Sequence, residues 1–208
     1  MQHAPGPLCS RCRVAATPDT PRRYAGHTAL ARPGGSPNVT GMAGPTPAIR
    51  AAAKAEVAHR VHTYPHDPRN DSFGAEAVAA LAERLGVQAG QIFKTLVIEL
   101  SGGSGGVRLA VAVLPVPTTL SLKAAAAALG ASKAVMADKT KAERTTGYVL
   151  GGISPLGQKR TLPTVVDASA LDWDRMLCSA GRRGLEIELD PRDLVRLTSA
   201  VTAPVTAG

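Results

Sequence analysis

Aromatic residues are scarce in this 208-residue chain, where Phe, Tyr and Trp make up 3% of the sequence. This composition disfavours a nucleic-acid-binding protein built on rows of stacked aromatic side chains. Long apolar runs are lacking as well, because the most continuous one, residues 109–116, is eight residues long and includes a proline. A membrane-spanning helix needs about 20 apolar residues, so we expect no membrane partner.

Cysteine is also sparse, and its three positions are Cys9, Cys12 and Cys178. An odd and small number of cysteines argues against the disulfide framework that stabilises many secreted proteins. The N-terminal region has no uninterrupted apolar segment of about 7 to 15 residues, as a secretory signal would have. We therefore expect a reducing, cytoplasmic setting.

Positive charge is present in excess, with 24 Lys and Arg against 16 Asp and Glu and a net charge of +8. Such an excess favours a polyanionic partner. Residues 1–41 contribute half of it, with five arginines and one acid, and they also contain six prolines and five glycines. Because this basic, Pro/Gly/Arg-rich extension has no apolar periodicity, we expect it to be disordered.

Two other interpretations of residues 1–41 stay open. The composition is similar to that of an organelle transit peptide, although the six prolines oppose the amphipathic helix of such peptides. Alternatively, translation starts at Met42, close to where the regular hydrophobic pattern begins. In each interpretation residues 42–208 form the folded domain, a length suited to a single core.

From Thr46 onward the periodicity predicts short helices alternating irregularly with strands. Helices are expected over residues 46–58, 71–85, 121–129, 138–146 and 190–200, and strands over 59–64, 91–100, 107–116, 134–136, 162–167, 175–179 and 185–189. No repeated strand–helix–strand unit is evident. The pattern therefore predicts an α+β fold with a single mixed, largely antiparallel and barrel-like sheet surrounded by short helices.

The common catalytic and cofactor motifs are missing. Cys9 and Cys12 form a CxxC without the second pair that zinc requires, so we expect no metal site. His59 and His62 would point to opposite faces of a strand, and with His66 they are interpreted as solvated or hydrogen-bonded. There is no G-x-S-x-G and no phosphate-binding glycine fingerprint, and Cys178 lies in an apolar strand. We expect no cofactor.

Three features remain as candidates for chemistry. Lys94 lies within an apolar strand, either as an edge-strand lysine that prevents aggregation or as a cation in a pocket wall. The stretch G-G-I-S-P-L-G at 151–157 is either an ordinary turn or a loop whose N–H groups meet a ligand. Arg182 and Arg183, between two glycines, form either a basic turn or a phosphate contact.

Several motifs lie in one order along residues 46–200. They are T-P-A at 46–48, H-T-Y-P-H-D-P at 62–68, F-G at 73–74, F-K-T-L at 93–96, L-A-V-A-V at 109–113, T-G-Y-V-L-G-G-I-S-P-L-G-Q-K at 146–159, L-P-T-V-V-D at 162–167 and G-R-R-G-L-E-I-E-L at 181–189. This set resembles the YbaK family of free-standing aminoacyl-tRNA deacylases, which are related to the editing domain inserted in bacterial prolyl-tRNA synthetases. Residues 1–45 have no counterpart in that family.

The resemblance implies a set of functional residues. Lys94 and Gly151 would be catalytic, and Lys94 would be the residue on which activity depends. The position of Glu186 holds Asp in many family members, so its carboxylate would reach one methylene further. Residues expected to bind the substrate are Tyr64, Phe73, Thr95, Gly152, Ile153, Ser154, Ser179 and Glu186.

The resemblance also implies the reaction and its partners. The substrate would be mischarged Cys-tRNA(Pro), with Cys-tRNA(Cys) as a further candidate, and prolyl-tRNA synthetase could deliver it. The cysteinyl thiol would attack its own ester carbonyl, with the rate advantage of an intramolecular reaction. Two alternatives stay open: a deacylase for Ala-tRNA(Pro) or another small aminoacyl-tRNA, and a non-catalytic module that binds tRNA or a synthetase.

Overall fold

A computed structural model describes residues 44–70, 72–103 and 106–207 of the chain. The expected extension at residues 1–41, Met42, and the Cys9–Cys12 motif lie outside the described residues. Within the described ranges, no helix has the length and apolar character needed to cross a membrane.

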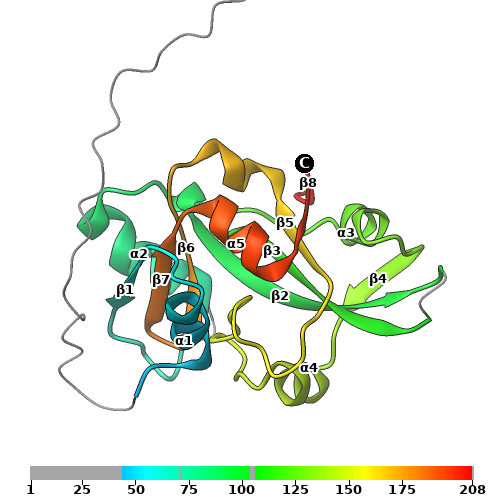
Figure 1. Ribbon diagram of the computed structural model, residues 1–208, viewed down its shortest axis with the longest axis horizontal. Coiled ribbons are helices and arrows are strands. Elements are labelled where there is room, and N and C mark those ends of the chain that lie inside the picture. The colour runs from blue at the N-terminus through cyan, green and yellow to red at the C-terminus, as the bar shows by residue number, and fades with distance from the viewer. Residues whose placement is uncertain (1–43, 71, 104–105, 208) are drawn as a thin grey trace, which may run out of the picture. The chain divides into compact units, whose positions relative to one another are not determined.

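The central element is one mixed sheet of eight strands (Figure 1). Along the sheet the strands follow the order β1-β7-β6-β2-β3-β5-β8, and β4 pairs with β2 outside this path. The strands are β1 (His59–Thr63), β2 (Ile92–Ser101), β3 (Arg108–Pro115), β4 (Lys133–Met136), β5 (Thr164–Asp167), β6 (Met176–Arg182), β7 (Leu185–Leu189) and β8 (Val201–Ala203). The predicted α+β class with a single mixed sheet is confirmed.

Antiparallel and parallel pairings coexist in this sheet. The hairpins β2–β3 and β6–β7, together with β1–β7 and β2–β4, are antiparallel. The pairings of β2 with β6, β3 with β5, and β5 with β8 are parallel. The parallel pairs join strands that are far apart in sequence, which is why hydrophobic periodicity did not predict them.

Five α-helices cover the sheet in the described part of the chain. They are α1 (Pro47–Lys54), α2 (Phe73–Leu85), α3 (Leu122–Ala128), α4 (Lys139–Thr146) and α5 (Pro191–Thr198). Four of them begin at an N-cap whose side-chain oxygen accepts a backbone N–H of the first turn: Thr46, Ser121, Asp138 and Asp190. These caps explain why the helix starts were predictable from sequence.

Two helix ends and one strand differ from the prediction. α1 ends at Lys54 and not at residue 58, because Glu56 adopts a left-handed φ of 55° and the Val57 N–H returns to the Ala52 carbonyl. α5 ends at Thr198, and Ser199 takes a φ of 49°. Helix ends of this kind are usually predicted from a glycine, because other residues rarely adopt such φ values. Neither of these two positions is a glycine, so the sequence pattern did not indicate where the helices end. The short strand β8 was not predicted.

Apolar side chains form a layer on each face of the sheet. One layer joins α1, α4 and α5 to β2 and β3 and includes Ala52, Phe93 and Leu194. On the other face, α3 packs over Ile98 and Leu100. The helix α2 packs separately over Ile92 and Leu177, through Leu81 among others. This packing fixes α2 beside the first residues of β2.

Candidate functional site

The candidate site lies where one edge of β2 has no neighbouring strand. Along one edge, β2 pairs with β3 from Phe93 to Leu100. Along its other edge, β2 pairs with β6 only at Ile92 and Phe93, and with β4 only from Ile98 to Ser101. The Ala137 N–H, just after β4, donates to the Val97 carbonyl at 3.1 Å. The described strands therefore leave residues 94–96 unpaired on that edge, and β6 and β4 diverge around them.

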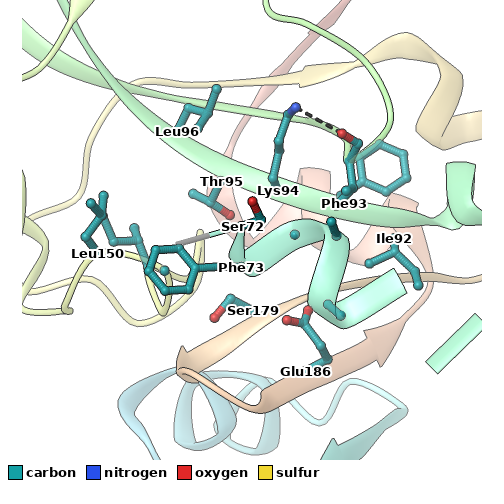
Figure 2. A pocket seen from close by; sticks show the side chains of 16 residues that line it. Ser72, Phe73, Ile92, Phe93, Lys94, Thr95, Leu96, Leu150, Ser179 and Glu186 are labelled. Carbon is teal, nitrogen blue, oxygen red and sulfur yellow. Dashed lines mark hydrogen bonds between the residues drawn. The ribbon is translucent and has the colours of Figure 1, made fainter. Parts of the chain in front are cut away.

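A cavity of about 400 Å³ occupies this position (Figure 2). Five consecutive residues of β2, from Ile92 to Leu96, line it, although alternate side chains of a strand point to opposite faces. The open strand edge explains this, because the cavity extends around it. The remaining walls come from the start of α2, from Val116, from the loop after α4, and from β6 and β7.

Lys94 supplies a cation to the wall of this cavity. Its ammonium donates to the carbonyl oxygen of Val116 at 3.0 Å and to that of Thr118. Partial burial lowers the pKa of Lys94. A lysine ammonium has three N–H donors, so one remains for a ligand. β2 is an interior strand of the sheet with a locally unpaired edge at Lys94, and this residue lines the cavity there, so the structure agrees with the pocket-wall interpretation.

The glycine-rich loop contributes backbone donors on another wall. Gly151 and Ile153 line the cavity, and their N–H groups have no acceptor among the described residues. The N–H of Gly152, in contrast, donates to the Val149 carbonyl at 2.9 Å. Gly151 and Ile153 are therefore the two residues of this loop whose N–H groups could donate to a substrate oxygen.

Close packing requires glycine at two positions of this loop. Gly151 has a φ of 81°, and a Cβ there would lie 2.6 Å from the Phe73 ring. A Cβ at Gly152 would lie 3.0 Å from backbone atoms of Arg182 and Arg183. The loop is thus held between the first residue of α2 and the β6–β7 turn.

The opposite end of the cavity carries a buried carboxyl group. Figure 2 separates the Lys94 amine from the side chains of Glu186 and Ser179. Glu186 is 6% exposed, and its Oε2 atom has no hydrogen-bond partner among the described residues. Burial raises the pKa of Glu186 to about 8. Thr95 Oγ1 is a second buried polar atom without a partner there, so the cavity holds two polar groups that a ligand could satisfy.

The structure places the predicted site residues in two groups. Lys94, Gly151, Phe73, Thr95, Ile153, Ser179 and Glu186 line the cavity. Tyr64, Gly152 and Ser154 are not lining residues. Tyr64 packs in the apolar cluster beneath α2, where burial and the nearby Glu186 raise its pKa. Ser154 is fully buried, and its Oγ accepts the N–H of Leu156 at 3.2 Å.

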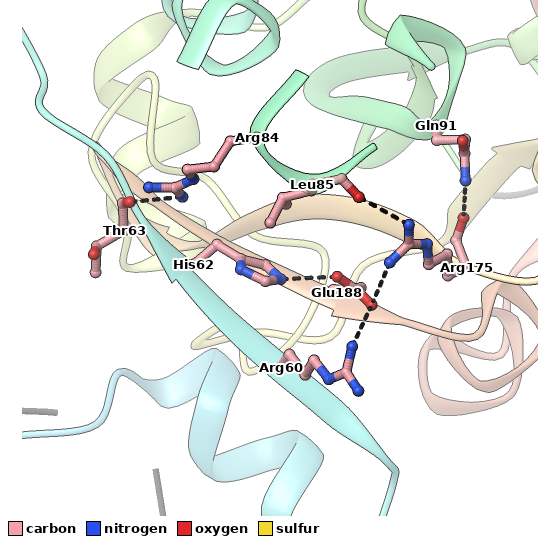
Figure 3. Close-up of polar contacts among 8 residues, drawn as sticks. All are labelled: Arg60, His62, Thr63, Arg84, Leu85, Gln91, Arg175 and Glu188. Atoms are coloured by element: carbon pink, nitrogen blue, oxygen red, sulfur yellow. Dashed lines mark hydrogen bonds and ion pairs between the residues drawn. The ribbon is translucent and has the colours of Figure 1, made fainter. Parts of the chain in front are cut away.

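Polar contacts behind the cavity hold α2 in place (Figure 3). His62 Nε2 lies 2.8 Å from Glu188 Oε2, and Arg175 bridges Glu188 to the Leu85 carbonyl at the end of α2. His59 and His66 have other partners, the Val57 carbonyl and the Glu76 carboxylate.

The described residues contain no cluster of three or more His, Cys, Asp or Glu side chains suited to a metal ion. Cys178 is fully buried, as expected, and burial raises its pKa.

Comparison with known proteins identifies the family. The family model of the aminoacyl-tRNA editing domain matches residues 74–197, which is more than half of the chain. A protein of Enterococcus faecalis named as a candidate Cys-tRNA(Pro)/Cys-tRNA(Cys) deacylase, EbsC, is 41% identical over 136 residues, which span 65% of this chain and 79% of that protein. The chain belongs to the aminoacyl-tRNA editing domain family.

Solved structures agree on the fold of this editing domain. The crystal structure of the hypothetical protein APE2540 is 25% identical with a TM-score of 0.64, over 78% of this chain and 100% of the other. A candidate trans-editing enzyme for prolyl-tRNA synthetase is 24% identical with a TM-score of 0.62, over 77% and 93%. Membership of a hydrolytic family makes the protein an aminoacyl-tRNA deacylase.

Several wall residues of the editing domain were missed by sequence reasoning. They include Ser72, Leu96, Leu150 and Val116. Leu96 and Leu150 had a signal, since they lie in the F-K-T-L motif and in the motif at 146–159. Ser72 and Val116 lie at element ends whose place beside β2 depends on long-range packing, and nothing local in the sequence marks them.

The raised pKa of Glu186 predicts a pH-dependent stability difference from the Glu186→Gln variant. Below pH 4.5 the carboxyl is protonated in both folded and unfolded states. From there to about pH 8 only the unfolded state loses the proton, so wild type is destabilised relative to the variant. The difference in unfolding free energy should shift by about 1.4 kcal/mol per pH unit and level off above pH 8.

Urea unfolding of both proteins from pH 4 to pH 9 measures this difference. Contributions of the other ionisable groups are common to both proteins and largely cancel. A difference that stays constant from pH 4.5 to pH 8 would show that Glu186 ionises normally in the folded protein.

Proposed function

We propose that this enzyme hydrolyses the ester of cysteinyl-tRNA(Pro). The observation that carries the proposal is the cavity at the open edge of β2, which combines one ammonium group, two unused backbone N–H groups and a small volume of about 400 Å³. The name of the 41% identical relative supports the same substrate. Prolyl-tRNA synthetase is the proposed partner that delivers the tRNA, consistent with the name of one structural relative.

The loop and Lys94 would stabilise the charge that develops on the ester. When a nucleophile attacks the carbonyl carbon, negative charge builds on the carbonyl oxygen. The N–H groups of Gly151 and Ile153 would donate to that oxygen. The Lys94 ammonium, held by the carbonyl oxygens of Val116 and Thr118, would use its third N–H for a hydrogen bond to the ribose oxygen of the ester.

The nucleophile would come from the substrate itself. The cysteinyl sulfur attacks its own carbonyl carbon, a C–S bond forms, and the C–O bond to the terminal ribose breaks. The thiol proton passes to the departing ribose oxygen, and water then hydrolyses the thiolactone to cysteine. This step needs no protein nucleophile, which fits the buried Cys178 with its raised pKa.

Glu186 and Thr95 would recognise the amino acid. The α-amino group of a cysteinyl ester carries N–H donors, and the unpaired Oε2 of Glu186 is an acceptor at the end of the cavity opposite Lys94. Thr95 Oγ1 would satisfy a second donor or acceptor on the same substrate. Binding would thereby remove two unpaired buried polar atoms, a gain that an apolar ligand cannot supply.

A panel of matched esters tests the proposed substrate. We expect Cys-tRNA(Pro) to be deacylated about 100-fold faster than Ser-tRNA(Pro), because a hydroxyl is a far weaker nucleophile than a thiol in the same ring closure. Binding differences between such small side chains are worth about 1 to 3 kcal/mol, which is of the same size, so the rates are compared at saturating enzyme, where binding does not contribute. Ala-tRNA(Pro) serves as the control without a nucleophile. The measurement is the single-turnover rate for each ester.

The outcomes separate the alternatives. Equal rates for Cys and Ser esters would overturn thiol assistance while leaving an editing enzyme. Preference for Ala-tRNA(Pro) would assign the protein to a different editing substrate. No turnover with any ester would favour a non-catalytic module that binds tRNA.

A further inference from the structure

Arg183 contacts residues of the cavity wall but does not line the cavity itself. Its guanidinium carbon lies 4.6 Å from the centre of the Phe73 ring, in a cation–π contact. Its Nε donates to the Leu150 carbonyl at 2.9 Å. Phe73 and Leu150 both line the cavity. One side chain thus contacts two residues that line the site.

These contacts use only part of the guanidinium. Arginine has five N–H donors in a planar fork, and the two terminal nitrogens carry four of them. No acceptor for these four is present among the described residues, and no described acid forms an ion pair with Arg183. Stacking on Phe73 fixes the plane of the fork, which lowers the entropy lost when it binds a ligand.

The chemistry of the fork selects the ligand. Two parallel N–H groups match the spacing of two oxygens on a phosphate or a carboxylate. The proposed substrate carries its amino acid on the terminal ribose, and the 5′-phosphate of that nucleotide is one ribose away from the ester. We propose that Arg183 binds this phosphate at the mouth of the site, an inference that rests on the proposed function.

The neighbouring arginine provides the contrast. Arg182 is adjacent in sequence and exposed, and the hydrogen bonds of the described residues give its side chain no fixed contact. A guanidinium without a stacking partner keeps its rotamer freedom and contributes mainly long-range charge. The two residues therefore carry the same charge, but only the side chain of Arg183 is held in place. Comparing a substitution of each residue distinguishes a specific phosphate contact from general electrostatic attraction to RNA.

The test compares two small substrates that differ only in the 5′-phosphate with the full-length substrate. They are 2′(3′)-O-cysteinyl-adenosine, the same nucleoside with a 5′-phosphate, and full-length Cys-tRNA(Pro). With Arg183→Ala we expect kcat/KM to fall about tenfold on the two phosphate-bearing substrates, mainly through KM, and much less on cysteinyl-adenosine. For Arg182→Ala we expect kcat/KM to fall less than twofold on all three substrates. Arg183→Lys should restore only part of the loss, because lysine has no fork.

Salt dependence gives a second readout. One phosphate contact on a single strand contributes about 0.7 to the slope of log affinity against log salt. The affinity for deacylated tRNA(Pro) is measured at several salt concentrations. The slope should be about 0.7 smaller for Arg183→Ala than for wild type, and the slope should decrease less for Arg182→Ala. This measurement requires no hydrolysis, so it stays informative if wild type deacylates none of the esters and the proposed function fails.

Two results would overturn the inference. Equal losses on all three substrates would show that Arg183 acts only by positioning Phe73. Equal effects of Arg182→Ala and Arg183→Ala on tRNA would show that diffuse positive charge, and not a phosphate contact, is responsible.

Discussion

Replacement of Lys94 by alanine is expected to lower kcat for deacylation of Cys-tRNA(Pro) by about 10³-fold. Among the described residues, its ammonium is the one lysine or arginine head group in the cavity lining, and two carbonyl oxygens fix its position. A donor fixed in a partly buried site needs no reorganisation when charge develops on the substrate, and its removal cannot be compensated by water. Single-turnover hydrolysis of purified Cys-tRNA(Pro) measures the loss.

The control variants separate chemistry from folding. Lys94→Met keeps most of the side-chain volume and should be as inactive as Lys94→Ala. Lys123→Ala removes the same charge from an exposed position on α3 and should leave the rate unchanged. Thermal unfolding of each variant shows whether the residues that Lys94 holds, Val116 and Thr118, still pack. A folded Lys94→Met protein with a rate within tenfold of wild type would contradict the proposed role.

Local chemistry explains most of the fold that was predictable. Thr46, Ser121, Asp138 and Asp190 mark helix starts because each side chain accepts a first-turn N–H. Gly86, after α2, takes the left-handed conformation that ends a helix. Glu56 takes a similar conformation without being glycine, and the prediction consequently extended α1 too far.

The candidate site was predictable only in part, because its shape depends on long-range pairing. The lysine within a strand was visible in sequence, but strand physics alone favoured an edge position for it. The actual reason for its place in the cavity wall is that β6 and β4 leave residues 94–96 of β2 uncovered. That arrangement requires the parallel β2–β6 pairing, for example of Ile92 with Leu177, 85 positions apart, which no local pattern specifies. The family resemblance supplied what the residues alone did not.

Loop geometry also refines the expected role of the two adjacent glycines. Gly151 lines the cavity with an N–H that has no acceptor among the described residues, whereas Gly152 uses its N–H to close a turn on Val149. The donor after Gly151 is therefore Ile153. Which of these N–H groups is free depends on the backbone conformation of the loop. The sequence G-G-I alone could therefore not distinguish the roles of the two glycines.

Replacement of Gly151 by alanine is expected to reduce kcat/KM by about 10³-fold. The new Cβ would lie 2.6 Å from two atoms of the Phe73 ring, and the Arg183 guanidinium on that ring restricts its retreat. Either the ring moves into the cavity or the loop withdraws its N–H groups from the substrate. A displacement of about 1 Å costs roughly 10² in rate, and loss of an oxyanion donor adds to it. Steady-state kinetics with Cys-tRNA(Pro) measures the change.

A matched glycine isolates the steric cause. Gly86 has a φ of 61°, and a Cβ added there would meet no described atom within 4 Å, so Gly86→Ala imposes similar backbone strain without a clash. We expect both variants to lose about 1 to 3 kcal/mol of unfolding free energy, and only Gly151→Ala to lose activity. The double variant Phe73→Ala/Gly151→Ala removes the ring and should be more active than Gly151→Ala alone. If the double variant shows no such recovery, contact between Gly151 and Phe73 does not set the geometry of the loop.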